Sequence, residues 1–158
     1  QDGVVTAATS SPLTDGASFV VVTSEEFAAE RGLSPLARIV STAVAGVPPE
    51  IMGIGPVPAA RKALDRAGLT MEDMNVIELN EAFSSQSLAV IDELGIDESR
   101  LNLDGGAIAI GHPLGASGAR ITGKAAALLK REEGRYALAT MCIGGGMGIA
   151  TVLASIDS

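Results

Sequence analysis

The chain has 158 residues, of which 47% are hydrophobic and 19% charged, and its formal net charge is −8. These values are typical of one globular domain, and an acidic chain without a run of basic residues is not expected to bind nucleic acid. A single cysteine excludes an internal disulfide and fits a reducing compartment.

The first half of the chain is predicted to alternate strands with helices. Residues 17–23 form a short apolar run rich in β-branched residues, which is typical of a buried strand. A capping box at residues 23–26 opens a helix through Ala29, and residues 37–45 form a second apolar strand. The glycine- and proline-rich stretch 46–58 predicts a loop, and Pro58 begins a helix that ends at Ala67.

The second half is predicted to add three strands and two long helices. The strands are residues 75–79, 135–141 and 148–155, the helices are residues 82–94 and 115–130, and residues 107–110 are strand-like. This order predicts an α/β layered domain with a mixed sheet whose final strand pair is antiparallel. No apolar run approaches the about 20 residues that span a bilayer, and no signal peptide is apparent. We therefore expect a cytoplasmic protein without membrane contact.

The only histidine, His112, lies in the glycine-rich stretch GGAIAIGHPLGASGAR of residues 105–120. Pro113 stiffens the turn that follows it, so the imidazole is expected to be held in place. A neutral imidazole is a natural general base near pH 7. A histidine satisfied by backbone groups is the commoner case for a lone residue, but its glycine-rich surroundings favour a catalytic role.

The only cysteine, Cys142, ends a predicted strand and enters the loop CIGGGMG of residues 142–148. The N–H groups of three consecutive glycines can converge on a developing oxyanion. The alternative is an inert buried thiol that packs as a small apolar side chain. One histidine and one cysteine cannot complete a structural zinc site, so we expect no metal.

Asn80 and Glu81 lie where a predicted strand gives way to a helix. Ligands of α/β proteins bind near the carboxyl ends of strands, so Asn80 is a candidate site residue. The alternative is that Asn80 is only a helix N-cap and Glu81 only a carboxylate favoured by the helix dipole.

Three motifs in this order and spacing resemble the C-terminal half of the thiolases: NEAF at 80–83, the stretch at 105–120 and CIGGGMG at 142–148. TAATSSPLTDGAS at 6–18 and MGIGPVPAARKAL at 52–64 extend the resemblance over essentially all of residues 1–158. It is a resemblance to acetyl-CoA acetyltransferases and 3-ketoacyl-CoA thiolases. It implies a thiolase-like layered α/β domain with a five-stranded mixed sheet and helices on both faces.

The resemblance also implies roles in reversible Claisen condensation and thiolysis of 3-ketoacyl-CoA. His112 would deprotonate a nucleophilic cysteine and, with a water held by Asn80, donate to the thioester oxygen. Cys142 would move the α-proton and protonate the leaving thiolate, and the N–H of Gly144 would line a second oxyanion hole. Met52 and Phe83 would border the acyl or pantetheine pocket. Coenzyme A and acyl-CoA are implied as substrates, with no covalently bound cofactor.

One departure from the family concerns the nucleophile, because the chain has no second cysteine to carry the acyl group. Together with the start at Gln1, this predicts an isolated C-terminal domain that is inactive alone and partners its own N-terminal half in a homodimer or homotetramer. One alternative is a non-catalytic, thiolase-like binding or oligomerisation module. Another is a hydrolase that uses Cys142 as its nucleophile, which is disfavoured because no helix N-terminus activates that thiol.

Overall fold

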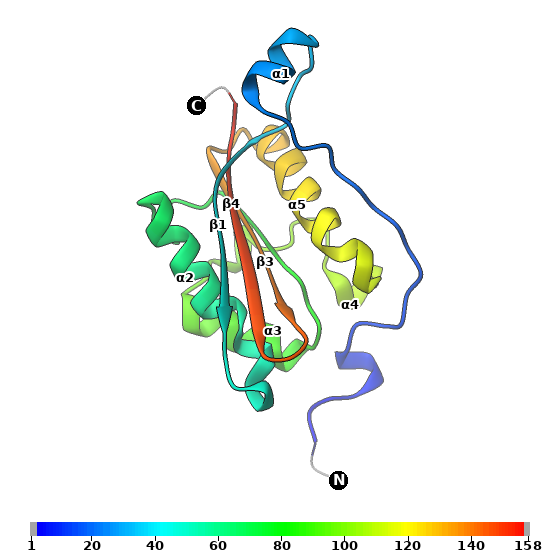
Figure 1. Ribbon diagram of the computed structural model, residues 1–158. Coiled ribbons are helices and arrows are strands. Elements are labelled where there is room, and N and C mark those ends of the chain that lie inside the picture. The colour runs from blue at the N-terminus through cyan, green and yellow to red at the C-terminus, as the bar shows by residue number, and fades with distance from the viewer. Residues whose placement is uncertain (1–2, 157–158) are drawn as a thin grey trace.

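The computed structural model describes residues 3–156 and contains a four-stranded mixed sheet (Figure 1). Its strands are β1 (Arg38–Gly46), β2 (Val76–Leu79), β3 (Tyr136–Ile143) and β4 (Met147–Ala154). They lie in the order β1-β4-β3-β2, with β2 and β3 parallel and the other pairs antiparallel. The predicted β3–β4 hairpin is confirmed, but the prediction of a fifth strand is wrong.

Residues 17–23 are extended but belong to no sheet in the described part of the chain. The Ser18 hydroxyl donates to the carbonyl of Ala116, 2.6 Å away, so the segment runs beside the long helix α5 (Leu114–Arg131). Phe19 and Val21 remain 90% and 84% exposed. Apolar β-branched composition favours extended backbone, but a strand also needs a neighbour for its hydrogen bonds, and none lies there.

Helices cover both faces of the sheet, as predicted (Figure 1). On β2, Val76 packs into the cluster that contains α5, whereas Ile77 packs into the cluster that contains α2 (Pro56–Ala67). The alternation is the period of two expected when each face of a strand is buried. The helix α3 (Ser84–Leu94) lies on the α2 side, where Val90 packs against Leu79.

Several helix ends follow local sequence chemistry. The helix α1 (Glu25–Glu30) begins after Ser24, whose hydroxyl accepts from the N–H of Phe27, as a capping box predicts. The helices α2 and α3 end at Gly68 and Gly95, which adopt φ of 67° and 62°. Only glycine takes this left-handed conformation without cost, so both predicted ends are confirmed.

Other boundaries differ from prediction. The predicted loop at 46–58 contains the 3₁₀ helix η2 (Pro49–Ile54), and α2 begins at Pro56 rather than Pro58. The strand-like residues 107–110 form a single helical turn, α4 (Ala107–Ile110). Two further 3₁₀ turns are η1 (Ala7–Thr9) and η3 (Glu98–Arg100). Within residues 3–156, no helix combines the length and apolar character needed to cross a membrane.

Candidate active site

The candidate site lies at the carboxyl edge of the parallel pair β2–β3. Asn80 directly follows β2, and its N–H donates to the carbonyl of Thr140 on β3, 3.0 Å away. Cys142 lies two residues beyond Thr140 on the same strand. Because parallel strands end at the same edge, the fold brings Asn80 and Cys142 to one end of the sheet.

His112 is held between two polar side chains at this edge. Its Nε2 lies 3.3 Å from the Asn80 Nδ2, and its Nδ1 lies 2.6 Å from the Ser117 Oγ. The Ser117 hydroxyl also donates to the carbonyl of Pro113, 3.1 Å away. One arrangement gives every contact a donor and an acceptor: the protonated Nδ1 donates a hydrogen bond to the Ser117 Oγ, and the Asn80 Nδ2 donates to Nε2. His112 therefore presents an unprotonated Nε2 towards Asn80.

The environment of His112 favours its neutral form. Partial burial lowers the pKa of the imidazole below its usual value, and the nearby positive charge of Arg120 lowers it further. Both effects disfavour the imidazolium. The His112 imidazole can therefore accept a proton near neutral pH and act as a base.

The turn before His112 depends on the N-terminal segment 6–18, for which the sequence indicated a family resemblance but no site role. Gly111 has φ of 97°, and a Cβ there would lie 2.5 Å from the Thr14 Oγ1. The N–H of His112 donates to that same oxygen, 3.2 Å away. Gly16 similarly lies against the ring of Pro113. Thr14 thus fixes the backbone of the histidine, a role that was not predicted for it.

Glu81 holds the other end of the histidine loop. Its Oε2 accepts from the N–H of Ile108 at 3.1 Å, and its Oε1 accepts from the Asn102 Nδ2 at 2.8 Å. Its carboxylate fills the place that a side chain at Gly106 would occupy. Since α3 begins at Ser84, the alternative of a helix N-cap at Asn80 and a first-turn carboxylate at Glu81 is wrong.

Cys142 is buried, with 5% of its surface exposed. Burial raises the pKa of its thiol, and a hydrogen bond with the backbone of Cys142 itself offsets part of that rise. A raised pKa makes the thiolate scarce near neutral pH, which argues against an autonomous nucleophile. The structure records no hydrogen bond between Cys142 and His112, both of which it describes.

In the turn between β3 and β4, the structure requires glycine at position 146 but not at position 144. Gly146 has φ of 85°, and a side chain there would meet the carbonyl of Val47. Gly144 has no positive φ, and a Cβ added to it would meet no atom within 4 Å. Neither backbone conformation nor internal packing therefore demands glycine at position 144, whose surface is open to an approaching group.

The two predicted pocket residues lie on segments that neighbour those of Cys142 and Asn80: Met52 is in η2, which contacts β3 and β4, and Phe83 lies three residues after Asn80. Met52 lies half-buried in η2, and the N–H of Val47 just before η2 donates to the carbonyl of Gly146, 2.7 Å away. Phe83 precedes α3, is 38% exposed and forms a β-bridge with Ser10. Their roles in binding remain predictions.

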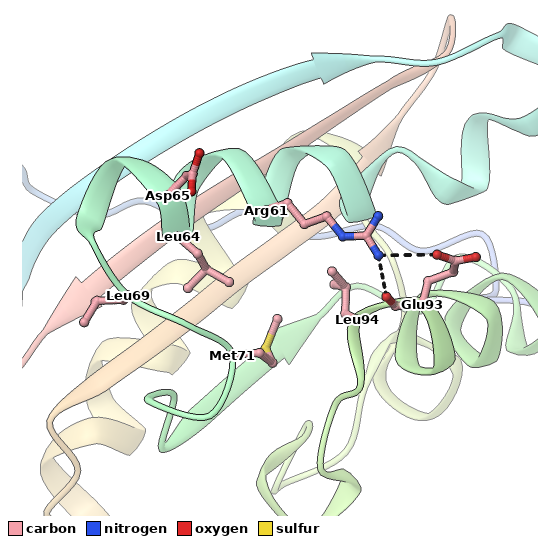
Figure 2. A pocket seen from close by; sticks show the side chains of 7 residues that line it. All are labelled: Arg61, Leu64, Asp65, Leu69, Met71, Glu93 and Leu94. Carbon is pink, nitrogen blue, oxygen red and sulfur yellow. Dashed lines mark hydrogen bonds and ion pairs between the residues drawn. The ribbon is translucent and has the colours of Figure 1, made fainter.

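A hollow of about 340 Å³ between α2 and α3 does not belong to this site. Figure 2 shows its lining, in which the Arg61 Nη2 donates to the carbonyl of Glu93 at 2.7 Å and lies 3.4 Å from its carboxylate. Leu69 and Met71 line it just before β2, at the end of that strand opposite Asn80. None of the predicted site residues lines this hollow.

Residues 33–155 match the family model described as "Thiolase, C-terminal domain". The chain belongs to the thiolase family. It is 56% identical over 154 residues to a 3-oxoadipyl-CoA/3-oxo-5,6-dehydrosuberyl-CoA thiolase of Escherichia coli, with 96% of this chain and 38% of that protein covered.

Solved thiolase structures share the fold. A Bacillus anthracis acetyl-CoA acetyltransferase superposes with a TM-score of 0.96 at 47% identity, covering 99% of this chain and 40% of that one. Human mitochondrial 3-ketoacyl-CoA thiolase in complex with CoA superposes at 0.92 with 48% identity, covering 98% of this chain and 39% of that one. The thiolase chain described here thus spans about two fifths of the length of these relatives.

Proposed function

We propose that this chain is the C-terminal catalytic half of a thiolase, an acyltransferase that carries out reversible Claisen condensation and thiolysis of 3-ketoacyl-CoA. The observation that carries the proposal is the chain of contacts from Asn80 through His112 to Ser117, at the sheet edge where Cys142 also lies. The acyl-carrying cysteine belongs to a part of the protein outside this chain, whose single cysteine is Cys142.

In thiolysis, His112 Nε2 takes the proton of the nucleophilic cysteine, whose sulfur attacks the 3-keto carbon. The bond between Cα and that carbon breaks, and Cys142 gives its proton to the Cα carbanion, which leaves as acetyl-CoA. The resulting thioester is then attacked by the sulfur of free CoA. The CoA thiol proton passes to the thiolate of Cys142, and the departing enzyme cysteine regains its proton from His112.

The environments of the two groups suit these steps. The lowered pKa of His112 leaves Nε2 free to accept a proton, and the raised pKa of Cys142 keeps its thiol protonated until a carbanion needs it. The Oδ1 of Asn80 is buried and accepts no hydrogen bond from the described residues, so it offers an acceptor to a water in the site.

The proposed partners follow from the same account. Acyl-CoA and CoA are the substrates, and the net charge of −8 places most cationic contacts to CoA phosphates on the remainder of the protein. That remainder is the N-terminal half, which we propose completes a homodimer or homotetramer in the cytoplasm. Met52, Phe83 and the N–H of Gly144 face the acyl thioester.

The test is thiolysis of acetoacetyl-CoA by the complete protein that contains this chain. Replacing His112 with Ala is expected to lower kcat at least about 1,000-fold, because base catalysis contributes about 10²–10⁴-fold and oxyanion stabilisation is lost as well. The isolated 158-residue chain is expected to show no turnover. A wild-type protein without thiolysis, or a fully active His112→Ala variant, would instead favour a non-catalytic module.

A further inference from the structure

A cluster of charged side chains lies behind the His112 loop, between β2 and α5. Glu78 is on the same face of β2 as Val76 and Asn80, and only 1% of it is exposed. The Nζ of Lys124 on α5 lies 3.7 Å from the Glu78 Oε1. Burying a carboxylate costs free energy unless a cation is close. The ammonium group of Lys124 therefore offsets part of the cost of burying Glu78 where β2 packs against α5.

Lys124 also reaches the loop that carries the histidine. Its Nζ donates to the carbonyl of Gly105, 3.1 Å away. Gly105 has φ of 89° and begins the run that ends at His112. One ammonium group therefore links β2, α5 and the start of the histidine loop, while Glu81 and Ser117 fix later points of the same loop.

Arg120 lies on α5 three residues after Ser117 and four before Lys124, so it shares their face of the helix. Its Nε and Nη1 are buried and have no hydrogen-bond partner in the described part of the chain. Its positive charge acts on both Glu78 and His112. Because no salt bridge among the described residues includes Arg120, its positive charge is only partly compensated and acts on the imidazole.

We propose that Glu78, Arg120 and Lys124 are positioning residues for His112: Lys124 and Glu78 anchor its loop, and Arg120 places a positive charge behind its imidazole. The proposal rests on the proposed thiolase function. Asp104 and Glu81 also act on Glu78, but each has its own partners, Arg131 for Asp104 and the Ile108 N–H for Glu81.

The protonation of Glu78 is consistent with this arrangement. Burial raises its pKa to about 7, against the opposing effects of Lys124 and Arg120. Near neutral pH the two cations are therefore balanced by at most one carboxylate. The excess positive charge disfavours a second proton on His112.

The anchoring role is tested by steady-state thiolysis of the complete enzyme. Lys124→Met is expected to lower kcat about tenfold with little change in the KM for CoA, because a displaced base slows the chemistry more than binding. Lys124→Arg keeps the cation and is expected to stay within about twofold of wild type. Lys130→Met removes an exposed lysine near the end of the same helix and is the matched control.

The electrostatic role is tested by the pH dependence of kcat/KM. Removing the charge with Arg120→Met is expected to raise the pKa of the acidic limb by about 0.5–1 unit, whereas Arg120→Lys leaves it near wild type. If Arg120→Met does not fold, Arg120→Gln makes the same comparison. Partial misfolding would lower the rate at every pH without moving the limb.

Each outcome decides between the claims. A Lys124→Met enzyme with wild-type kcat, or an Arg120→Met or Arg120→Gln enzyme with an unmoved acidic limb, overturns the proposed positioning role. A wild-type enzyme that shows no thiolysis at all instead overturns the proposed function on which this inference rests.

Discussion

At the scale of single residues, Ser117 determines which ring nitrogen of His112 carries the proton. This serine is fully buried, and its hydroxyl both accepts from Nδ1 and donates to the carbonyl of Pro113. The imidazole therefore keeps Nε2 as its acceptor without the carboxylate partner that many catalytic histidines have. Neither its spacing nor its residue type distinguished Ser117 in the sequence from an ordinary helix serine.

Replacing Ser117 with Ala is expected to lower kcat about tenfold, because the imidazole loses the partner that fixes its tautomer. The backbone N–H groups of Ala116 and Ser117 still donate to the carbonyl of Pro113. Only the half-buried ring nitrogen loses its partner, at a cost of about 0.5–1.5 kcal/mol in the free energy of unfolding. Thiolysis and denaturant unfolding of the complete enzyme measure the two effects.

The matched control is Thr122→Ala, which removes a similar hydroxyl on the same helix. The Thr122 hydroxyl donates to the carbonyl of Gly118 at 2.8 Å and does not contact the histidine. Equal kcat for the Ser117 and Thr122 variants would contradict the role given to Ser117.

At the scale of elements, the β3–β4 turn contains one glycine that the backbone requires, Gly146, and one for which we propose a role in the site, Gly144. Gly146→Ala is expected to destabilise the protein by about 1–3 kcal/mol, because its φ is positive and the carbonyl of Val47 occupies the space. Gly144→Ala meets open space, so its free energy of unfolding is expected to change by less than about 0.5 kcal/mol.

The Gly144→Ala variant is nevertheless expected to lose thiolysis activity, because the added methyl group occupies the surface proposed for the thioester. Thermal unfolding and thiolysis of both variants in the complete enzyme make the comparison. A Gly144→Ala enzyme that is stable and fully active would remove Gly144 from the proposed site.

The elements that the sequence predicted correctly are those with a local physical cause. The ends of α2 and α3 were predictable because a glycine at the helix end adopts positive φ. The β3–β4 hairpin was predictable because two apolar runs flank a short glycine-rich loop. Residues 107–110 were mispredicted because four apolar residues fit either a strand or a helical turn, and the distant Glu81 contacts the N–H of Ile108.

The candidate site likewise contains residues that the sequence predicted and residues that it could not predict. Its chemically distinctive residues, His112 and Cys142, could be named from their glycine-rich loops. The residues that hold them, Thr14 and Lys124, could not, because their contacts are 98 and 19 residues away along the chain. Such contacts depend on the tertiary fold and leave no periodic pattern in the sequence.

At the scale of the whole molecule, the chain spans 38–40% of the length of its relatives and exposes several large apolar side chains in residues 13–22. Leu13, Phe19, Val21 and Val22 are each at least 68% exposed. Predicting residues 17–23 as a buried strand was wrong for this chain, since their burial requires a surface that residues 3–156 do not provide. We propose that the remainder of the thiolase covers this segment, as it also supplies the nucleophile.

The central claim is that Cys142 moves protons while another cysteine carries the acyl group. It is tested by incubating the complete enzyme with acetyl-CoA, without an acceptor, and locating the acetyl group by peptide mass spectrometry. Wild type and Cys142→Ser are both expected to carry it on a cysteine outside this chain. The variant is expected to be acetylated more slowly, because the leaving CoA thiolate has lost its proton donor, and to have lost thiolysis. An acetyl group on Cys142, or a Cys142→Ser enzyme with wild-type thiolysis, would contradict the account.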